Sequence, residues 1–246
     1  MSSEPKPPEK NAGQVPHSDD AALLAHEMIS ATLPFSARVA ERGGVDAELV
    51  EQPALSDDEL IAAVQRGDAK IGGLLYQRLI RVIDATLTRV LGPGDQDHDD
   101  CVQNAFEEVV RSLYGGRFLR RCRLTSWAAS IACHIGLNAI RSRRSERRIF
   151  DRSEDVEAPT RSVPPRPPER VLEARDELRR LRTALATLSP GRAEAVLLHD
   201  ALGYGIAEVA ALTASTEAAV LSRLTRGRRD LLERLGQIRI DHEAAT

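Results

Sequence analysis

The sequence predicts an all-α protein of two helical domains joined by a proline-rich linker, and three observations lead to this fold class. Aromatic residues make up only 3% of the 246 residues, so the core must be built from aliphatic side chains, a composition that suits packed helices better than sheets. Apolar residues recur at helical spacing along two long stretches of the chain. Five prolines crowd between positions 159 and 168 and separate those two stretches with an extended segment.

Composition divides the chain further. The segment before the first helical stretch is acidic and rich in Pro, Ser and Glu, so we expect it to be largely disordered, apart from a short helix over Ser18–Ser30. The expected parts are the N-terminal extension (1–55), the first helical domain (56–150), the linker (151–168), the second helical domain (169–236) and a tail (237–246).

Four helices are expected in the first domain. Ser56, with Glu59 three residues later, has the pattern of a helix N-cap with its capping box, and Gly67 ends that helix. The other helices are expected over Ala69–Leu91, which Gly92-Pro93-Gly94 ends, over Asp97–Leu113 and over Thr125–Arg148.

The second domain begins near Glu169, and its pattern predicts a helix-turn-helix within Leu178–Leu235. Ser189-Pro190 fits the N-cap and first position of a helix. A short helix over Ile206–Leu212, a turn and a long helix over Thr216–Leu235 follow, and the second helix of such a pair enters the DNA major groove. The predicted buried seam consists of Ile206, Val209, Ala210, Val220 and Leu224. The alternative is a plain helical hairpin with a solvated basic face.

Charge is unevenly distributed along the chain. The net charge is -3, yet residues 1–60 hold twelve acids and four bases, whereas residues 111–152 hold eleven arginines and two acids. Concentrated arginine in a nearly neutral chain indicates a polyanionic partner. A simple replacement of lysine by arginine would explain the residue type, but it would not explain the clustering.

The sequence also disfavours several classes of protein. No apolar run approaches the roughly 20 residues that cross a bilayer, and the polar N-terminus has no signal-peptide core, so we expect no membrane insertion and a cytoplasmic location. The three cysteines, Cys101, Cys122 and Cys133, fit neither a disulfide framework nor a zinc motif.

An enzymatic alternative rests on a short cluster of acids and histidine. These residues could bind a divalent metal, as in a hydrolase. Acids are expected at a helix N-terminus in any case, because the helix dipole favours them, and no nucleophile–base motif or phosphate-binding loop accompanies them. We therefore expect no enzymatic activity and no cofactor. The cluster consists of Asp95, Asp97, His98, Asp99 and Asp100.

The second domain resembles region 4 of the sigma-70 family of bacterial transcription initiation factors, most closely the extracytoplasmic function group. The matching stretch is LRTALATLSPGRAEAVLLHDALGYGIAEVAALTASTEAAVLSRLTRGRRDLLERL. The first domain resembles region 2 through DDELIAAVQRGD, DHDDCVQNAF and LTSWAASIACHIGLNAIRSRRSERR. The resemblance implies a sigma factor that binds RNA polymerase core, recognises two promoter elements, aids DNA melting and has an anti-sigma partner. The alternative is a sigma-like DNA-binding regulator without melting activity.

The resemblance also implies which residues form each contact. Val102 and Phe106 match the family pattern too, but we expect them to be core residues, and we expect Trp127 to be core first. The implied polymerase contacts are Asp99, Asp100 and Gln103. The implied DNA contacts of the first domain are Arg117, Arg120, Arg121, Arg123, Trp127, His134, Asn138, Arg141, Arg143 and Arg144. Those of the helix-turn-helix are Glu217, Leu221, Ser222, Arg223, Thr225, Arg226 and Arg229.

Three positions depart from the family pattern. Ser130 and His134 stand where many members have arginine and asparagine, so the usual minus-10 preference is in doubt. Leu221 stands where a lysine or arginine is usual, and a lost phosphate contact lowers the salt dependence of binding by about one unit. We therefore expect a modest affinity for the minus-35 element, or an unusual sequence for it.

Overall fold

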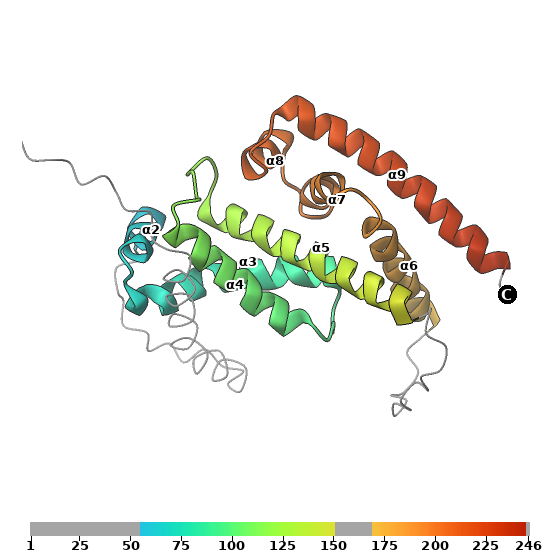
Figure 1. Cartoon of the computed structure of the whole chain (residues 1–246), viewed down its shortest axis with the longest axis horizontal. Helices are drawn as coiled ribbons and strands as arrows, with labels where there is room; N and C mark the ends of the chain where they lie inside the picture. The colour runs from blue at the N-terminus through green and yellow to red at the C-terminus, as the bar shows by residue number, and fades with distance from the viewer. Residues whose placement is uncertain (1–54, 151–168, 245–246) are drawn as a thin grey trace, which may run out of the picture.

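The structure, a computed structural model, describes residues 55–150 and 169–244, and all regular elements in these ranges are helices (Figure 1). The all-α prediction is therefore confirmed. The helix expected over Ser18–Ser30 and the linker lie outside the described residues. The N-terminal bundle contains α2 (Asp57–Gln65), the 3-10 turn η1 (Ala69–Ile71), α3 (Gly72–Leu91), α4 (His98–Tyr114) and α5 (Leu124–Phe150). The C-terminal bundle contains α6 (Glu169–Leu185), α7 (Pro190–Val196), the π-helical turn η2 (Leu197–Ala201), α8 (Ile206–Leu212) and α9 (Glu217–Ala244).

Local side-chain chemistry sets the start of the first helix. The Ser56 hydroxyl accepts a hydrogen bond from the Glu59 amide at 3.3 Å, and the Glu59 carboxylate accepts one from the Ser56 amide at 2.8 Å. The backbone hydrogen bond from Ser56 lowers the pKa of Glu59 below its ordinary value. This reciprocal arrangement is the capping box that the sequence predicted.

Three helix boundaries differ from the prediction. The Asp68 carboxylate accepts a hydrogen bond from the Lys70 amide at 3.1 Å, and this cap holds a 3-10 turn before α3 begins at Gly72. Ser189 and Pro190 start α7 as expected, but the chain widens into η2 after Val196. The last helix continues beyond Leu235 to Ala244. Gly236, which follows the expected end, costs a helix only about 1 kcal/mol, and no proline follows.

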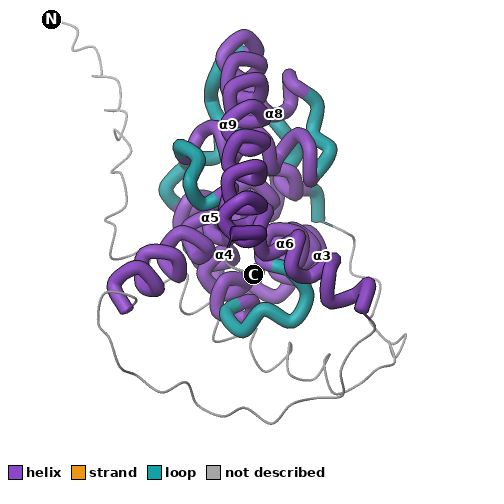
Figure 2. Tube along the Cα trace, turned by 90° about the vertical axis from the view of Figure 1, so that its right-hand side faces the viewer, coloured by secondary structure: helices purple, strands orange, loops and turns teal. Residues whose placement is uncertain are grey.

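Helix α5 lies at the centre of the molecule, with α3 and α4 on one side and the C-terminal helices on the other (Figures 1 and 2). Close approach between α3 and α5 depends on Gly136, which is buried. A Cβ atom at this position would come within 2.8 Å of Val90 Cγ1 and 3.3 Å of Leu87 Cδ2. The buried α5 side chains that form the core are Leu124, Ala128, Ala132, Cys133, Leu137 and Ile140.

The two bundles share one continuous apolar core, and polar contacts reinforce their interface. Arg182 of α6 donates from Nε to the Val90 carbonyl oxygen at 2.9 Å. Its guanidinium lies over Gly92, where a Cβ atom would approach Nη2 to 2.5 Å. Arg141 of α5 donates to the Leu188 carbonyl oxygen at 3.3 Å. The linker therefore joins two bundles that are packed against each other in this structure.

We expect Gly136→Ala to lower the free energy of unfolding by roughly 1–2 kcal/mol, because the steric cost at Val90 exceeds the helix-propensity gain from alanine. Gly73 in α3 is the matched control, since a Cβ atom there would meet nothing within 4 Å. Gly73→Ala should raise the stability by about 0.5 kcal/mol. Urea unfolding of both variants measures the difference, and equal stabilities would contradict the tight α3–α5 contact.

Candidate nucleic-acid interface

The arginine-rich loop between α4 and α5 is fixed at two points. The buried Phe118 ring packs on Trp127, with ring centroids 4.9 Å apart. Arg120, which has a positive φ of 56°, pairs with Asp58 of α2. Arg121 and Arg123 are exposed, so the loop presents positive charge to solvent while its base is held.

Trp127 and Ser130 serve mainly in packing. Trp127 is partly buried against the core, as expected. Ser130 is buried and its hydroxyl donates to the Trp127 carbonyl oxygen at 2.7 Å. The departure from the family pattern at this position therefore adds a packing residue and no accessible polar group.

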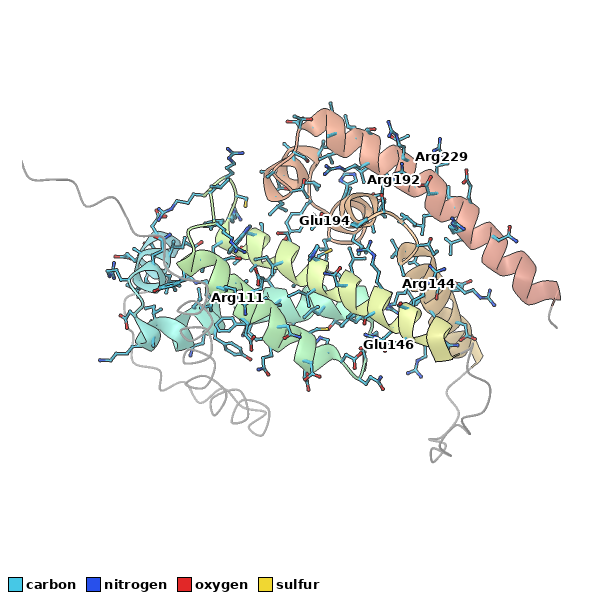
Figure 3. The ribbon with its side chains drawn as sticks, viewed as in Figure 1. Arg111, Arg144, Glu146, Arg192, Glu194 and Arg229 are labelled. Carbon is cyan, nitrogen blue, oxygen red and sulfur yellow. The ribbon has the colours of Figure 1, made fainter. Side chains whose placement is uncertain are left out.

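The predicted DNA contacts of α5 do not all reach solvent. His134 and Asn138 are exposed, one helical turn apart, and Arg141 follows on the same face but is partly buried by its contact with Leu188. Arg144, which Figure 3 labels near the end of α5, is partly buried. On this face of α5, His134 and Arg141 lie next to Glu194 and Leu188 of the C-terminal bundle.

Arg143 is bound to acids of its own bundle. Its Nη1 lies 2.7 Å from Asp95 Oδ2 and its Nε lies 3.0 Å from Asp97 Oδ2. Burial alone would raise the pKa of Asp95, but hydrogen bonds from Arg143 and from the Asp97 amide outweigh it and lower that pKa. Arg143 was expected in the DNA-binding groove, and the structure instead gives it a partly buried ion pair.

These pairs also account for two members of the cluster that suggested a metal. Asp95 and Asp97 face Arg143, and His98 Nε2 lies 3.2 Å from Thr88 Oγ1. Within 55–150 and 169–244 no group of three His, Cys, Asp or Glu side chains is arranged to hold a metal ion. The remaining acids, Asp99 and Asp100, point to solvent from the first turn of α4.

The candidate polymerase contacts form an exposed polar strip on α4. Asp99 and Asp100 are exposed, and the exposed Gln103 donates from its amide to Glu107 at 3.2 Å. Phe106, in contrast, is buried and its ring packs edge-on against Tyr76. The expectation that Phe106 is a core residue is confirmed, and Val102 is partly buried against the same core.

The helix-turn-helix consists of α8 and α9 with the turn Thr213–Thr216 between them. Val209, Ala210, Val220 and Leu224 are buried and Ile206 packs against them, which confirms the predicted seam. Thr213 Oγ1 and Ser215 Oγ lie 2.8 Å apart, and the Ser215 amide donates to the Ala210 carbonyl oxygen at 2.9 Å. These contacts fix the angle at which α9 leaves the turn.

The outward face of α9 differs from the expected set of contacts. Glu217, Leu221, Thr225, Arg226 and Arg229 are exposed, and Figure 3 shows Arg229 on the outer side of the helix. Ser222 is partly buried. Arg223 turns inward over α7, where a Cβ atom at Gly191 would lie 3.4 Å from its Nε.

Two ion pairs that the sequence did not predict hold α9 on the rest of its bundle. Arg228 donates from Nε to Asp200 Oδ2 at 2.9 Å, and this hydrogen bond lowers the pKa of Asp200. Asp230 pairs with Arg192 of α7. Partners 28 and 38 residues apart leave no periodic signal in a sequence, so only the folded arrangement reveals them.

Glu194 is a further residue that sequence reasoning missed. It projects from α7 into the interface with α5 (Figure 3) and is partly buried. Burial raises its pKa, while the neighbouring His134, Arg223 and Arg141 oppose the rise. Its position as a lone acid in an otherwise apolar run, Ala193–Leu198, is the signal that could have marked it.

A helix-turn-helix with arginines on the outward side of its second helix, beside a bundle with its own arginine-rich loop, defines a helical DNA-binding protein. Among helical DNA-binding proteins, the known proteins that this chain resembles are sigma factors. The family described as Sigma-70, region 4, matches residues 178–231. RNA polymerase sigma factor CarQ of Myxococcus xanthus is 31% identical over 144 residues, which cover 58% of this chain and 77% of CarQ.

The chain is also similar to a sigma factor of another organism and to a solved structure. ECF RNA polymerase sigma factor SigM of Mycobacterium tuberculosis is 28% identical over 189 residues, or 74% of this chain and 86% of SigM. The solved CnrH, in complex with the cytosolic domain of CnrY, has a TM-score of 0.42 and 24% identity, covering 72% of this chain and 96% of CnrH. The chain belongs to the sigma-70 family of transcription initiation factors, in the extracytoplasmic function group.

None of the described helices combines the length and the apolarity that spanning a bilayer requires. The longest of them differ in where their charges lie: α9 carries charged residues along much of its length, whereas those of α5 are confined to its last third, from Arg141 onward.

We expect Arg143→Ala to lower the free energy of unfolding by about 2–3 kcal/mol, because it leaves the partly buried Asp95 without its cation. The lowered pKa of Asp95 means that its ionised form stabilises the fold above about pH 4, and this contribution is lost as the pH falls. The difference between wild type and variant should therefore shrink on acidification, as measured by urea unfolding at several pH values.

Arg144→Ala is the matched control, since Arg144 has no ion pair among the described residues. It should change stability by less than about 0.5 kcal/mol and reduce the salt dependence of DNA binding by about one unit. A similar loss of stability in both variants would contradict a structural function specific to Arg143.

Proposed function

We propose that this chain binds RNA polymerase core and directs promoter-specific initiation, with one bundle reading each of two promoter elements and the N-terminal bundle aiding strand opening. The observation that carries the proposal is the presence of two separate arginine-bearing elements, the loop with α5 and the outward face of α9, in one member of the sigma-70 family. The chain catalyses no covalent reaction, needs no cofactor and acts in the cytoplasm.

The exposed strip on α4 is the proposed contact with polymerase core. Asp99, Asp100 and Gln103 reach solvent, while Phe106 anchors the same helix in the core. Asp99 and Asp100 lie in the first turn of α4, where the helix dipole stabilises acidic groups, so these two carboxylates are compatible with the fold in the absence of polymerase. We further propose an anti-sigma partner, which family membership supports.

Strand opening requires cations along the unpaired strand and surfaces on which displaced bases can stack. The exposed Arg121 and Arg123 are suited to the first requirement, and the exposed α5 residues His134 and Asn138 offer polar groups that can form hydrogen bonds with DNA. We propose that the two bundles are the functional domains, 56–150 and 169–236. A regulator that binds promoters without melting them is the second candidate, because His134 replaces the usual asparagine.

Transcription in vitro with purified core polymerase and a library of genomic fragments tests the proposal. We expect promoter-specific transcripts that require this chain. Joint replacement of Asp100 and Gln103 by alanine should weaken core binding by roughly tenfold, or 1.4 kcal/mol, whereas Asp176→Ala with Glu177→Ala on exposed α6 should not. Promoter binding without permanganate-reactive thymines would favour the non-melting regulator, and no specific transcript from any fragment would refute the sigma function.

The packing of the two bundles has a consequence for this function. The C-terminal bundle covers part of the α5 face that is proposed to read DNA, because Arg141 donates to the Leu188 carbonyl oxygen. Glu194 places a carboxylate where His134 and Arg141 would otherwise meet phosphate. Since DNA and α7 cannot occupy one surface together, we propose that the bundles separate before α5 engages the promoter.

Arg182→Ala tests this separation, because it removes the hydrogen bond to Val90 and the packing on Gly92. We expect the free variant to bind promoter DNA several-fold more tightly than wild type and to show a longer distance between fluorophores placed on the two bundles. Arg179→Ala on the same helix, exposed and paired with Asp176, is the control. A longer distance together with an unchanged affinity would show that the packing does not compete with DNA.

A further inference from the structure

A leucine occupies the centre of the α9 surface that faces outward from the helix-turn-helix. The Leu221 side chain is 52% exposed. Glu217 and Thr225, four residues before and after it, are also exposed, so the three side chains form one row along the helix. A row of this kind on a recognition helix lies along the base edges of the major groove.

Few hydrogen-bonding groups surround Leu221 in this row. The Thr225 hydroxyl already donates to the Leu221 carbonyl oxygen at 2.9 Å. Arg223 turns inward over Gly191, and Arg228 is bound to Asp200. The exposed Arg226 and Arg229 remain, one to two turns further along the helix. Base recognition at the centre of the row therefore depends on an apolar side chain.

The backbone holds Leu221 outward. Its neighbours in the buried seam, Val220 and Leu224, are 0% and 2% exposed, so the helix cannot rotate to hide the leucine without exposing them. Gly227 packs so closely on α7 that a Cβ atom would come within 2.9 Å of Val196 Cγ2. The pair of Arg192 and Asp230 closes the same contact.

The chemistry of the major groove limits what this leucine can recognise. Each base pair presents donors and acceptors there, and the protruding apolar group is the C5-methyl of thymine. Contact with that methyl removes apolar surface from water on both sides, whereas a leucine set against a donor or acceptor leaves it unpaired. We propose that Leu221 is a specificity-determining residue that selects thymine in the upstream promoter element through its C5-methyl group. This inference rests on the proposed function of α9 as a promoter reader.

Replacement of thymine by uracil, which removes only the methyl group, provides the test. Holoenzyme assembled from core polymerase and the full chain is first used to select an upstream element from a randomised promoter library. Each thymidine of the selected element is then replaced in turn by deoxyuridine, and holoenzyme affinity is measured. We expect one replacement to lower wild-type affinity about 3- to 10-fold, the discrimination of an apolar contact with a methyl group.

Two variants of Leu221 test whether this residue causes the sensitivity to uracil. In Leu221→Ala holoenzyme the same thymine and uracil elements should bind equally, whereas Leu221→Met should keep a preference for thymine. Leu232→Ala is the matched control, because Leu232 is 71% exposed on the same helix, about three turns beyond Leu221. Since Leu221 is exposed, its replacement should leave the folded bundle intact, which thermal unfolding of the full chain verifies.

Different results would overturn the function assigned to Leu221 and the proposed function of the whole chain. A selected element that tolerates uracil at every position, or a sensitivity that persists in Leu221→Ala, would overturn the function assigned to Leu221 and leave the sigma function standing. Selection of no element, together with no promoter-specific transcription, would overturn the proposed function and this inference with it.

Discussion

The rest of the structure depends on helix α5, because it is packed from two sides. One face is buried against α3 and α4, where the absence of a side chain at Gly136 allows the helices to approach closely. The other side carries the C-terminal bundle, through the hydrogen bond of Arg141 with the Leu188 carbonyl oxygen and through the surroundings of Glu194. The helix that we propose to read promoter DNA is therefore also the helix on which the two bundles pack, and one surface cannot serve both purposes at once.

Pairing with acids decides which arginines can bind DNA. Arg143 and Arg228 lie in ion pairs with Asp95 and Asp200 that hold helices together, so a count of arginines overstates the positive charge available to a phosphate backbone. Arg121, Arg123 and Arg226 keep exposed positions. The exposed surface is therefore less basic than the number of arginines in the sequence suggests, and this is consistent with the apolar contact that we propose for Leu221.

The two elements that we propose to read the promoter differ in how firmly they are held. The loop before α5 is fixed by the Phe118–Trp127 contact and by Arg120, and its intervening residues remain open to solvent. The recognition helix α9 is held along much of its length by a buried seam and by pairs that reach α7 and η2. A rigid reader suits duplex DNA with a fixed groove, whereas an exposed cationic loop suits strands that separate.

The sequence by itself determined the class of fold, most helix positions, the helix-turn-helix seam and the family. Periodicity, capping residues and family motifs are local patterns, so Ser56, Ser189 and Val220 could be assigned without coordinates. Only the tertiary structure decided that Arg143 and Arg223 turn inward, that Glu194 faces α5 and that the two bundles are packed together. Those features depend on side chains from helices far apart in the chain, and no periodic pattern records which of them meet.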